Sequence, residues 1–328
     1  MKKTIFLLLT AMALLTACNE TKERKQTAPS KGLPSELMLV VDREVWTTDV
    51  QDTILAIVEG QVPGLMQAEK MFRVTRVFTR DYAPTHSTFH TILRICLDKS
   101  LPGPITGTAR DTHARPQLEV MVAAPDIDRL RTYLSRNALR LQDLLAEAQI
   151  GFRVATLRKK YSRKVSDDLR EVLGMSVCAP ENLVATKKGK DFLWGGTNTL
   201  QKDQNILVYT YPWQGEDVMD VDRFVEKRDS VIRRNIPGER PDQWMQTVRQ
   251  DGVPLTVSRP RTIDGRRVLE VRGLWEMRNG ALGGPFVSLA RVDTAAARVV
   301  VAEGWVYSPS TDKRDLLRQM EAALRTLR

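Results

Sequence analysis

The sequence has 328 residues and a formal net charge of +10 at pH 7. Its composition, 42% hydrophobic and 27% charged, indicates a globular chain long enough for one large or two ordinary domains, and it excludes an extensively disordered protein. The chain lacks the aromatic-plus-basic motifs that bind nucleic acid. We therefore expect its basic surface to be solvated, or to meet anionic lipid, acidic glycan or acidic protein.

The N-terminus predicts an export signal that ends at a lipidation site. Lys2 and Lys3 precede an apolar run over residues 5–15, and small residues then lead to Cys18. This pattern resembles the lipobox of bacterial lipoproteins, in which a peptidase cuts before a cysteine that carries a diacylglyceryl group. Residues 1–17 are then a signal peptide, and palmitate-type acyl chains anchor the protein. The alternative is an ordinary cleaved signal followed by an incidental cysteine.

The anchor predicts where the protein resides. Each buried methylene contributes about 0.8 kcal/mol, so two or three acyl chains hold a protein on a membrane. The apolar run is too short to span the bilayer as a helix. Because Asn19 is not the aspartate that resembles an inner-membrane retention signal, we expect a cell-envelope lipoprotein of the outer membrane. Whether its body lies in the periplasm or on the cell surface stays open.

A polar segment connects the anchor to the body. Residues 18–34 carry both charges and contain Pro29, Gly32 and Pro34. Such a composition cannot bury a core. It predicts a lipidated flexible tether with a reach on the order of 20 Å.

Residues 35–161 predict a first α+β module. Helical recurrence of apolar residues predicts a helix over residues 52–60 and a long or kinked one over residues 126–161. The stretch from 98 to 116 is polar and punctuated by proline and glycine, which is typical of a loop. Short apolar runs predict strands at residues 37–41, 71–79, 89–97 and 118–123.

Residues 162–328 predict a second α+β module, with extra strands at residues 175–196. A helix with Gly174 as its C-terminal stop opens this module. Further helices are expected at residues 221–236 and 316–327. Strands are expected at residues 205–211, 268–277, 285–292 and 298–307.

The two modules share one order of elements. Each has a strand, a helix, a Pro-Gly turn (Val62-Pro63-Gly64 or Ile236-Pro237-Gly238), three strands and a last helix. This order predicts an internal duplication into two similar β-α-β-β-β-α modules. Each would have a largely antiparallel sheet with helices packed on one face, an α+β fold. A chance match between unrelated α+β segments is the alternative.

The densest local signal lies between residues 272 and 286. Asn279-Gly280 between two strand runs predicts a hairpin with a type I′ turn. Gly283-Gly284-Pro285 then indicates a bulge or a close approach of another backbone. The functional interpretation is a ligand-facing hairpin with an aromatic platform and a carboxylate, formed by Trp275, Glu276, Asn279, Gly283, Gly284 and Phe286. The alternative is a structural hairpin whose Trp275 and Phe286 belong to the core.

Several motifs together resemble an uncharacterised family of bacterial envelope lipoproteins, a domain of unknown function. They are Gly273-Leu274-Trp275-Glu276, Gly283-Gly284-Pro285-Phe286, Gln204-Asn205-Ile206-Leu207 leading to Tyr211-Pro212, and Glu303-Gly304-Trp305-Val306-Tyr307 before Lys313-Arg314. The resemblance covers nearly the whole mature chain. It implies location and a related fold, and it assigns no catalytic residue.

Catalysis has one weak candidate in the sequence. Glu276 and Glu303 would form the carboxylate pair of a glycan-acting hydrolase if their strands were neighbours. His86 and His90 lie four apart in a strand-like context, too far apart to share a metal. Cys96 and Cys178 are either bridged or free and buried. The basic run at residues 259–267 is interpreted as a solvated loop or a contact with anionic head groups.

These observations favour a membrane-anchored binding or structural module without a cofactor or metal. Its expected partners are the membrane, through Cys18, and an envelope glycan or protein. The alternatives are the hydrolase and an adaptor for anionic lipid or glycan.

Overall fold

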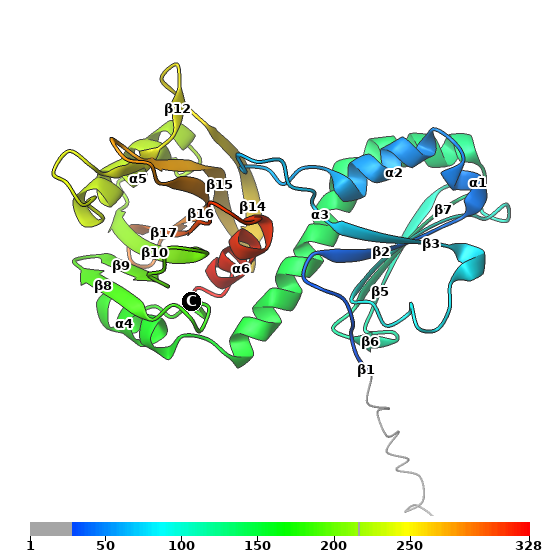
Figure 1. Cartoon of the computed structure of the whole chain (residues 1–328), viewed down its shortest axis with the longest axis horizontal. Coiled ribbons are helices and arrows are strands. Elements are labelled where there is room, and N and C mark those ends of the chain that lie inside the picture. The colour runs from blue at the N-terminus through cyan, green and yellow to red at the C-terminus, as the bar shows by residue number, and fades with distance from the viewer. Residues whose placement is uncertain (1–27, 216) are drawn as a thin grey trace, which may run out of the picture.

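A computed structural model describes residues 28–215 and 217–328 of the chain. It is a mixed α+β structure with two main sheets, one in each half, and the long helix α3 (Ile127–Lys159) lies beside both (Figure 1). The predicted α+β class is confirmed. The signal peptide, Cys18 and the first part of the predicted tether lie outside the described residues.

The first half contains a five-stranded sheet in the order β3-β2-β4-β7-β5. Its strands are β2 (Glu36–Val41), β3 (Arg73–Phe78), β4 (Thr91–Leu97), β5 (Ile105–Arg110) and β7 (Leu118–Ala124). β3, β2, β4 and β7 pair in parallel, and β5 alone is antiparallel. The expectation of an antiparallel sheet is therefore wrong for this half. Parallel neighbours need long crossover connections, and α2 provides one between β2 and β3.

Helices cover one face of this first sheet. α2 (Val50–Glu59) and α3 pack on it together with the short α1 (Arg43–Trp46). The inward residues of the strands, among them Leu37, Leu39 and Val120, are fully buried beneath them. Asp126 caps α3 by accepting a hydrogen bond of 2.8 Å from the Arg129 N–H, so the helix begins where the sequence predicts.

Two segments predicted as irregular carry strands. β5 lies within the stretch expected to be a loop, and its side chains are largely exposed, so it shows no apolar pattern. In the predicted tether, β1 (Ala28–Pro29) pairs with β6 (Ala114–Arg115). Backbone hydrogen bonds also join Lys31 to Thr88 and His90. The tether segment from residue 28 onward is therefore bound to the first half.

The second half begins at α4 (Arg163–Leu173), which ends at Gly174 with φ +70°, as predicted. Its main sheet has the order β11-β15-β16-β17-β10-β9-β8, and β14 also pairs with β15. All of these pairings are antiparallel. The strands are β8 (Ala185–Gly189), β9 (Phe192–Gly196), β10 (Asp203–Pro212), β11 (Met245–Thr247), β14 (Thr256–Ile263), β15 (Arg266–Met277), β16 (Gly283–Asp293) and β17 (Arg298–Tyr307). β12 (Arg249–Gln250) and β13 (Val253–Pro254) form a separate small hairpin.

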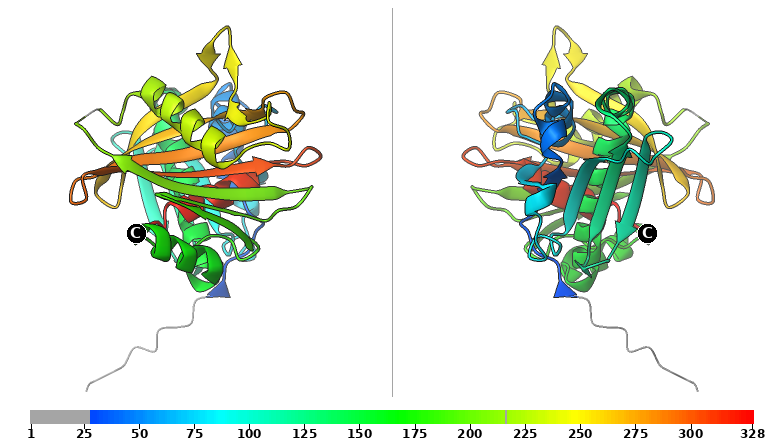
Figure 2. Two further views of the ribbon diagram at one scale, coloured as in Figure 1. Left: turned by 90° about the vertical axis from the view of Figure 1, so that its left-hand side faces the viewer. Right: turned by 90° about the vertical axis from the view of Figure 1, so that its right-hand side faces the viewer.

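Helices cover both faces of the second sheet. α5 (Val221–Asn235) packs on one face, and α4 and α6 (Arg314–Leu324) pack on the other (Figure 2). The expected arrangement of helices on one face is therefore wrong here. The duplication is not supported either, because a parallel sheet covered by helices on one face differs in topology from an antiparallel sheet covered on both.

Charged side chains connect the two halves. Asp143 and Glu147 on α3 bind Arg259 and Arg261 on β14, and Glu147 also accepts a hydrogen bond of 3.1 Å from Arg325. A second cluster surrounds Asp315 of α6, which accepts hydrogen bonds of 2.6 Å from the Ser35 hydroxyl and 2.7 Å from Arg153. Because α3 contributes to both clusters, it holds the two sheets in a fixed relation.

No helix within residues 28–215 and 217–328 is long and apolar enough to cross a membrane.

Candidate functional site

The predicted ligand-facing hairpin is part of the core. Trp275 is 4% exposed and Phe286 is fully buried, and both pack in the cluster beneath α5. Glu276 lies on the opposite face of β15 and accepts a hydrogen bond of 2.9 Å from Gln246. Side chains alternate along a strand, so of these two neighbours it is the glutamate that points away from this cluster. An aromatic platform for a sugar is not presented to solvent at this hairpin.

The backbone geometry of the hairpin explains its glycines without a ligand. Asn279 adopts φ +54°, while Gly280 is not in the left-handed region, so the hairpin forms without the predicted type I′ turn. Gly284 sits in regular register with Trp275 and does not form a bulge. A Cβ there would overlap the Val306 carbonyl oxygen of β17. The predicted close approach of another backbone is therefore what this glycine permits.

Glu276 and Glu303 are not brought together. Glu276 pairs with Gly283 of β16, and Glu303 of β17 pairs with Ser288 of the same strand. Positions 283 and 288 of β16 lie on opposite faces because side chains alternate along a strand. The two carboxylates thus point to opposite sides of the sheet and cannot act on one glycosidic bond.

Glu303 instead forms a buried ion pair with Arg228 of α5. Both side chains are fully buried, and the guanidinium makes two hydrogen bonds of 2.7 and 2.8 Å to the carboxylate. The Ser288 hydroxyl donates a third hydrogen bond of 2.6 Å to Glu303. The Arg228 guanidinium also lies 4.0 Å from the ring centroid of Phe286. Because Arg228 and Ser288 bind both carboxylate oxygens, Glu303 has a structural role and attaches α5 to the sheet.

The remaining predicted residues have local partners. His86 Nδ1 accepts a hydrogen bond of 2.9 Å from the Ala83 N–H, and His90 is buried beside Thr91. Cys96 and Cys178 are free thiols and form no bridge. Within the described ranges, no group of three or more His, Cys, Asp or Glu side chains could hold a metal ion.

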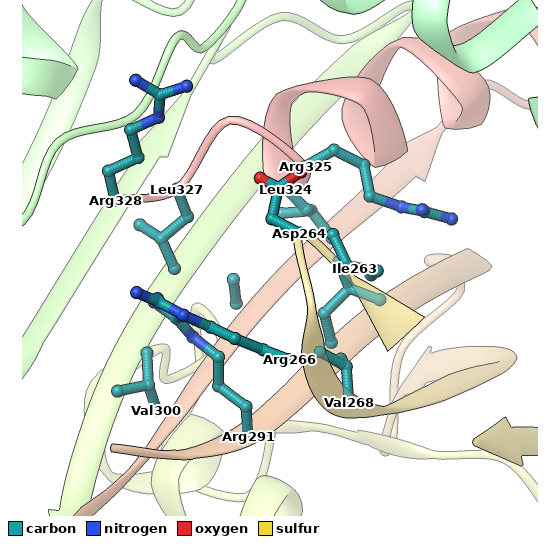
Figure 3. A pocket seen from close by; sticks show the side chains of 12 residues that line it. Ile263, Asp264, Arg266, Val268, Arg291, Val300, Leu324, Arg325, Leu327 and Arg328 are labelled. Carbon is teal, nitrogen blue, oxygen red and sulfur yellow. The ribbon is translucent and has the colours of Figure 1, made fainter. Parts of the chain in front are cut away.

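The strongest candidate site is a pocket that the sequence did not predict. It lies beside the end of α6, on the sheet face opposite α5, and has a volume of about 400 Å³ (Figure 3). We call it the arginine pocket, because Arg266 and Arg291 line it. Its aliphatic walls come from three adjacent strands and from the C-terminal end of the chain: Val268, Leu289, Val300, Ala302, Leu324 and Leu327.

A type I′ turn builds the edge of the arginine pocket. Asp264 and Gly265 adopt φ +49° and +74°, and Ile263 pairs directly with Arg266 across the turn. Two residues with positive φ match the twist of an antiparallel pair, and Asp-Gly is a favoured sequence for it. The turn thus fixes where Arg266 enters β15.

The two arginines have no counter-ion of their own. Within residues 28–215 and 217–328, neither guanidinium has a hydrogen bond or ion pair. Burial lowers the pKa of Arg291, and the like charge of Arg266 lowers it further. Asp293 acts in the opposite direction, but its carboxylate is bound to Arg298 at 3.1 Å. Asp264 is the only acidic residue among the described residues that line the pocket, beside four arginines, so the pocket presents a net positive charge.

Asp264 also lines the pocket, and among the described residues its carboxylate binds neither Arg266 nor Arg291; the other two arginines are directed elsewhere. Arg325 binds Glu147 and Glu321, at 3.1 and 3.2 Å. Its side chain and that of Arg328 point away from the two central guanidinium groups, which lie near each other (Figure 3). Arg266 and Arg291 are thus left to bind a ligand, and guanidinium groups bind carboxylate or phosphate oxygens with charge-assisted hydrogen bonds.

Two features of the sequence indicate part of this site. Val287, Leu289 and Arg291 alternate along β16, so an arginine occupies a position where the pattern continues an inward apolar face. Arg266 belongs to the basic run that was interpreted as a solvated loop or a head-group contact. Their proximity depends on how β15 and β16 pair, which local sequence does not specify.

Comparison with protein families now places the chain. A family described as a domain of unknown function, DUF4837, matches residues 162–326, which is half of the chain. The chain belongs to the DUF4837 family. The matched region contains the whole arginine pocket except Leu327 and Arg328. A second domain of unknown function, DUF8532, matches residues 30–158.

The predicted membership of a family of unknown function is thus confirmed. No curated protein matches the chain. The DUF4837 match ends within two residues of the C-terminus and begins just before α4. The match assigns no activity to the chain.

Proposed function

We propose that this DUF4837 protein is a lipid-anchored binding module of the bacterial cell envelope, and that its arginine pocket binds an anionic ligand. Cys18 would carry the acyl chains, and the outer membrane is the expected location. The anchor is supported by the lysines, apolar run and small residues that precede Cys18. Residues 19–27, between the anchor and β1, would then limit how far the body can move from the lipid surface.

The observation that carries the binding function is the uncompensated pair Arg266 and Arg291. Two like charges near each other, one of them partly buried among aliphatic residues, raise the free energy of the empty pocket. A carboxylate or phosphate between them would remove the repulsion and supply the missing hydrogen-bond acceptors. Neither arginine has a protein carboxylate bound to it among the described residues, whereas Arg228 is held by Glu303.

A binding module is favoured over the glycan-acting hydrolase. The hydrolase needs two carboxylates that flank one bond on the same side. Glu276 and Glu303 face opposite sides of the sheet, and Glu303 is fully buried in its ion pair.

Binding is tested with inorganic phosphate as the probe, using the full chain purified in lipid discs and isothermal titration calorimetry. We expect saturable binding that weakens about tenfold or more in Arg291→Met, because a hydrogen bond to a charged group contributes roughly 1.5–3 kcal/mol. Arg267→Met is the matched control, since its side chain alternates to the other face of β15 and has no partner among the described residues. Equal affinity in the wild type and both variants would overturn the binding function.

Anchoring is tested separately. Mass spectrometry of the protein isolated from membranes should find the mature N-terminus at Cys18 with acyl chains attached. Cys18→Ser should prevent cleavage before residue 18 and the attachment of acyl chains. An unacylated Cys18 in a chain that retains Lys2 and Lys3 would refute the anchor and leave the phosphate result unaffected.

A further inference from the structure

The arginine pocket has an aliphatic part that binding of a bare anion would leave unused. Val268, Leu289 and Val300 come from three neighbouring strands and face the same side of the sheet. Ala302 continues this row toward α6, where its small side chain leaves room. Val300 pairs directly with Arg291, and Leu289 and Ala302 lie two residues further along their strands. The aliphatic floor, whose side chains are at most 7% exposed, therefore extends from beside Arg291 toward α6.

The end of α6 covers this floor. Leu324, in the last turn of α6, and Leu327, just after it, form the facing wall. Leu327 is partly exposed, so one side of the pocket remains open to solvent. Backbone hydrogen bonds of 2.9 and 3.0 Å between Ser176 and Arg328 hold the segment after α6 in place. The wall is thus fixed at both ends and does not depend on a ligand.

The volume suits a small amphiphile. The pocket holds about 400 Å³, which is within the range of roughly 300–1,000 Å³ for small-molecule sites. Since one water occupies about 30 Å³, an anion such as phosphate would leave most of this space to ordered water against aliphatic walls. An aliphatic chain attached to the anion would displace that water favourably.

We propose that the ligand of the arginine pocket is an anion that carries a single aliphatic chain, such as a fatty acid or a monoalkyl phosphate of the lysophospholipid type. This proposal rests on the proposed function and specifies its ligand class. The acidic group binds between Arg266 and Arg291, and the chain lies along the row from Val268 to Ala302 beneath Leu324. The two arginines thus select for a charged group, and the aliphatic floor selects for the length of the chain.

The test is a series of ligands of increasing chain length, titrated into the full chain in lipid discs with empty discs as the blank. One arm uses inorganic phosphate, butyl phosphate and hexyl phosphate, and the other uses acetate, butanoate and hexanoate. We expect the affinity to rise about fourfold for each methylene buried. Comparing the two arms identifies whether a phosphate or a carboxylate headgroup binds more tightly.

Two variants separate the parts of the site. Arg291→Met should weaken every anion and leave the increment per methylene unchanged. Leu327→Asn, at a partly exposed position that tolerates a polar group, should reduce the increment in affinity per methylene. Hexanol, which has the chain without the charge, should bind far more weakly than hexyl phosphate.

The outcomes distinguish the two proposals. If phosphate binding depends on Arg291 but the affinity is flat with chain length, the aliphatic ligand is refuted and the anion-binding function stands. If no ligand in either arm responds to Arg291→Met, both proposals fail. If hexanol binds as tightly as hexyl phosphate, the charged group contributes nothing to binding, and both proposals fail as well.

Discussion

Glu69 and Arg314 belong to different halves of the chain, and the Glu69 carboxylate accepts a hydrogen bond of 2.9 Å from the backbone N–H of Arg314. Its second oxygen accepts one of 2.7 Å from the N–H of Lys313. Glu69 is 7% exposed, so a buried carboxylate of the first half satisfies the N-terminus of α6, the helix whose other end covers the arginine pocket.

We expect Glu69→Gln to destabilise the fold by about 1–2 kcal/mol, because the amide keeps one acceptor and turns an N–H toward a donor. Urea unfolding would measure the change. Glu239→Gln is the matched control, at an exposed glutamate without a partner in the described part of the chain. Equal losses in the two variants would mean that the contact between the halves contributes no stability.

The buried pair Arg228–Glu303 predicts strong non-additivity. Glu303→Leu should destabilise the protein by about 3–5 kcal/mol, since it leaves the buried Arg228 guanidinium with only the Asp229 carboxylate at 3.1 Å and the Thr247 hydroxyl as partners. Replacing both residues, with Arg228→Met and Glu303→Leu, should restore stability above either single variant. A double-mutant cycle by urea unfolding tests this prediction. Additive losses would show that the two side chains do not interact as the geometry indicates.

The contact between β16 and β17 predicts that Gly284 tolerates no side chain. Gly284→Ala should cost roughly 1–3 kcal/mol or more, because the strands must separate to admit the methyl group. Gly107→Ala is the control, since a Cβ there meets Met121 at an ordinary 3.8 Å. Thermal unfolding of both variants measures the difference. A Gly284→Ala protein as stable as the control would contradict the close approach of the Val306 carbonyl.

Acid should weaken the ion pairs behind the arginine pocket. Burial raises the pKa of Glu321, but Arg272 at 2.6 Å and Arg325 at 3.2 Å outweigh it and lower the pKa to about 2. A carboxyl whose folded pKa lies below its unfolded value of 4.5 stabilises the protein above about pH 4.5. That contribution is lost progressively as the pH falls from 4.5 toward 2.

The stability difference between the wild type and Glu321→Gln should therefore be largest at pH 6 and shrink at pH 4 and pH 3. Urea unfolding at each pH measures it. Glu239→Gln, whose glutamate is exposed, should show a small difference at every pH. A Glu321→Gln difference that stays constant with pH would refute the lowered pKa.

Local sequence predicted elements well where one face of an element is buried. α3 and the buried strands β2, β4 and β7 of the first half follow the apolar spacing closely. β5 and β14 were missed because they are edge strands with exposed side chains, and Pro260 further obscures β14. Pairing direction was also missed, since the same apolar run serves a parallel or an antiparallel neighbour.

The candidate site also depends on strand pairing, which local sequence does not specify. The sequence left Trp275 either on a ligand-facing surface or in the core, because alternation identifies two faces without saying which is covered, and in this sheet helices cover both. Arg266 and Arg291 lie 25 positions apart and meet through the register of β15 and β16. The Asp-Gly pair at residues 264–265 is itself a sequence signal for a type I′ turn, and this turn sets Arg266 in place.

The central claim is that the arginine pocket holds an aliphatic anion, and the most direct measurement is the ligand that the protein carries from the cell. The full chain, purified from envelopes with the variants Arg291→Met and Arg267→Met, would be extracted with organic solvent and the released small molecules identified by mass spectrometry. We predict a fatty acid or monoalkyl phosphate in the wild type and in Arg267→Met, near one per protein, and its loss from Arg291→Met. The same amounts of the same molecules in all three extracts would contradict the account.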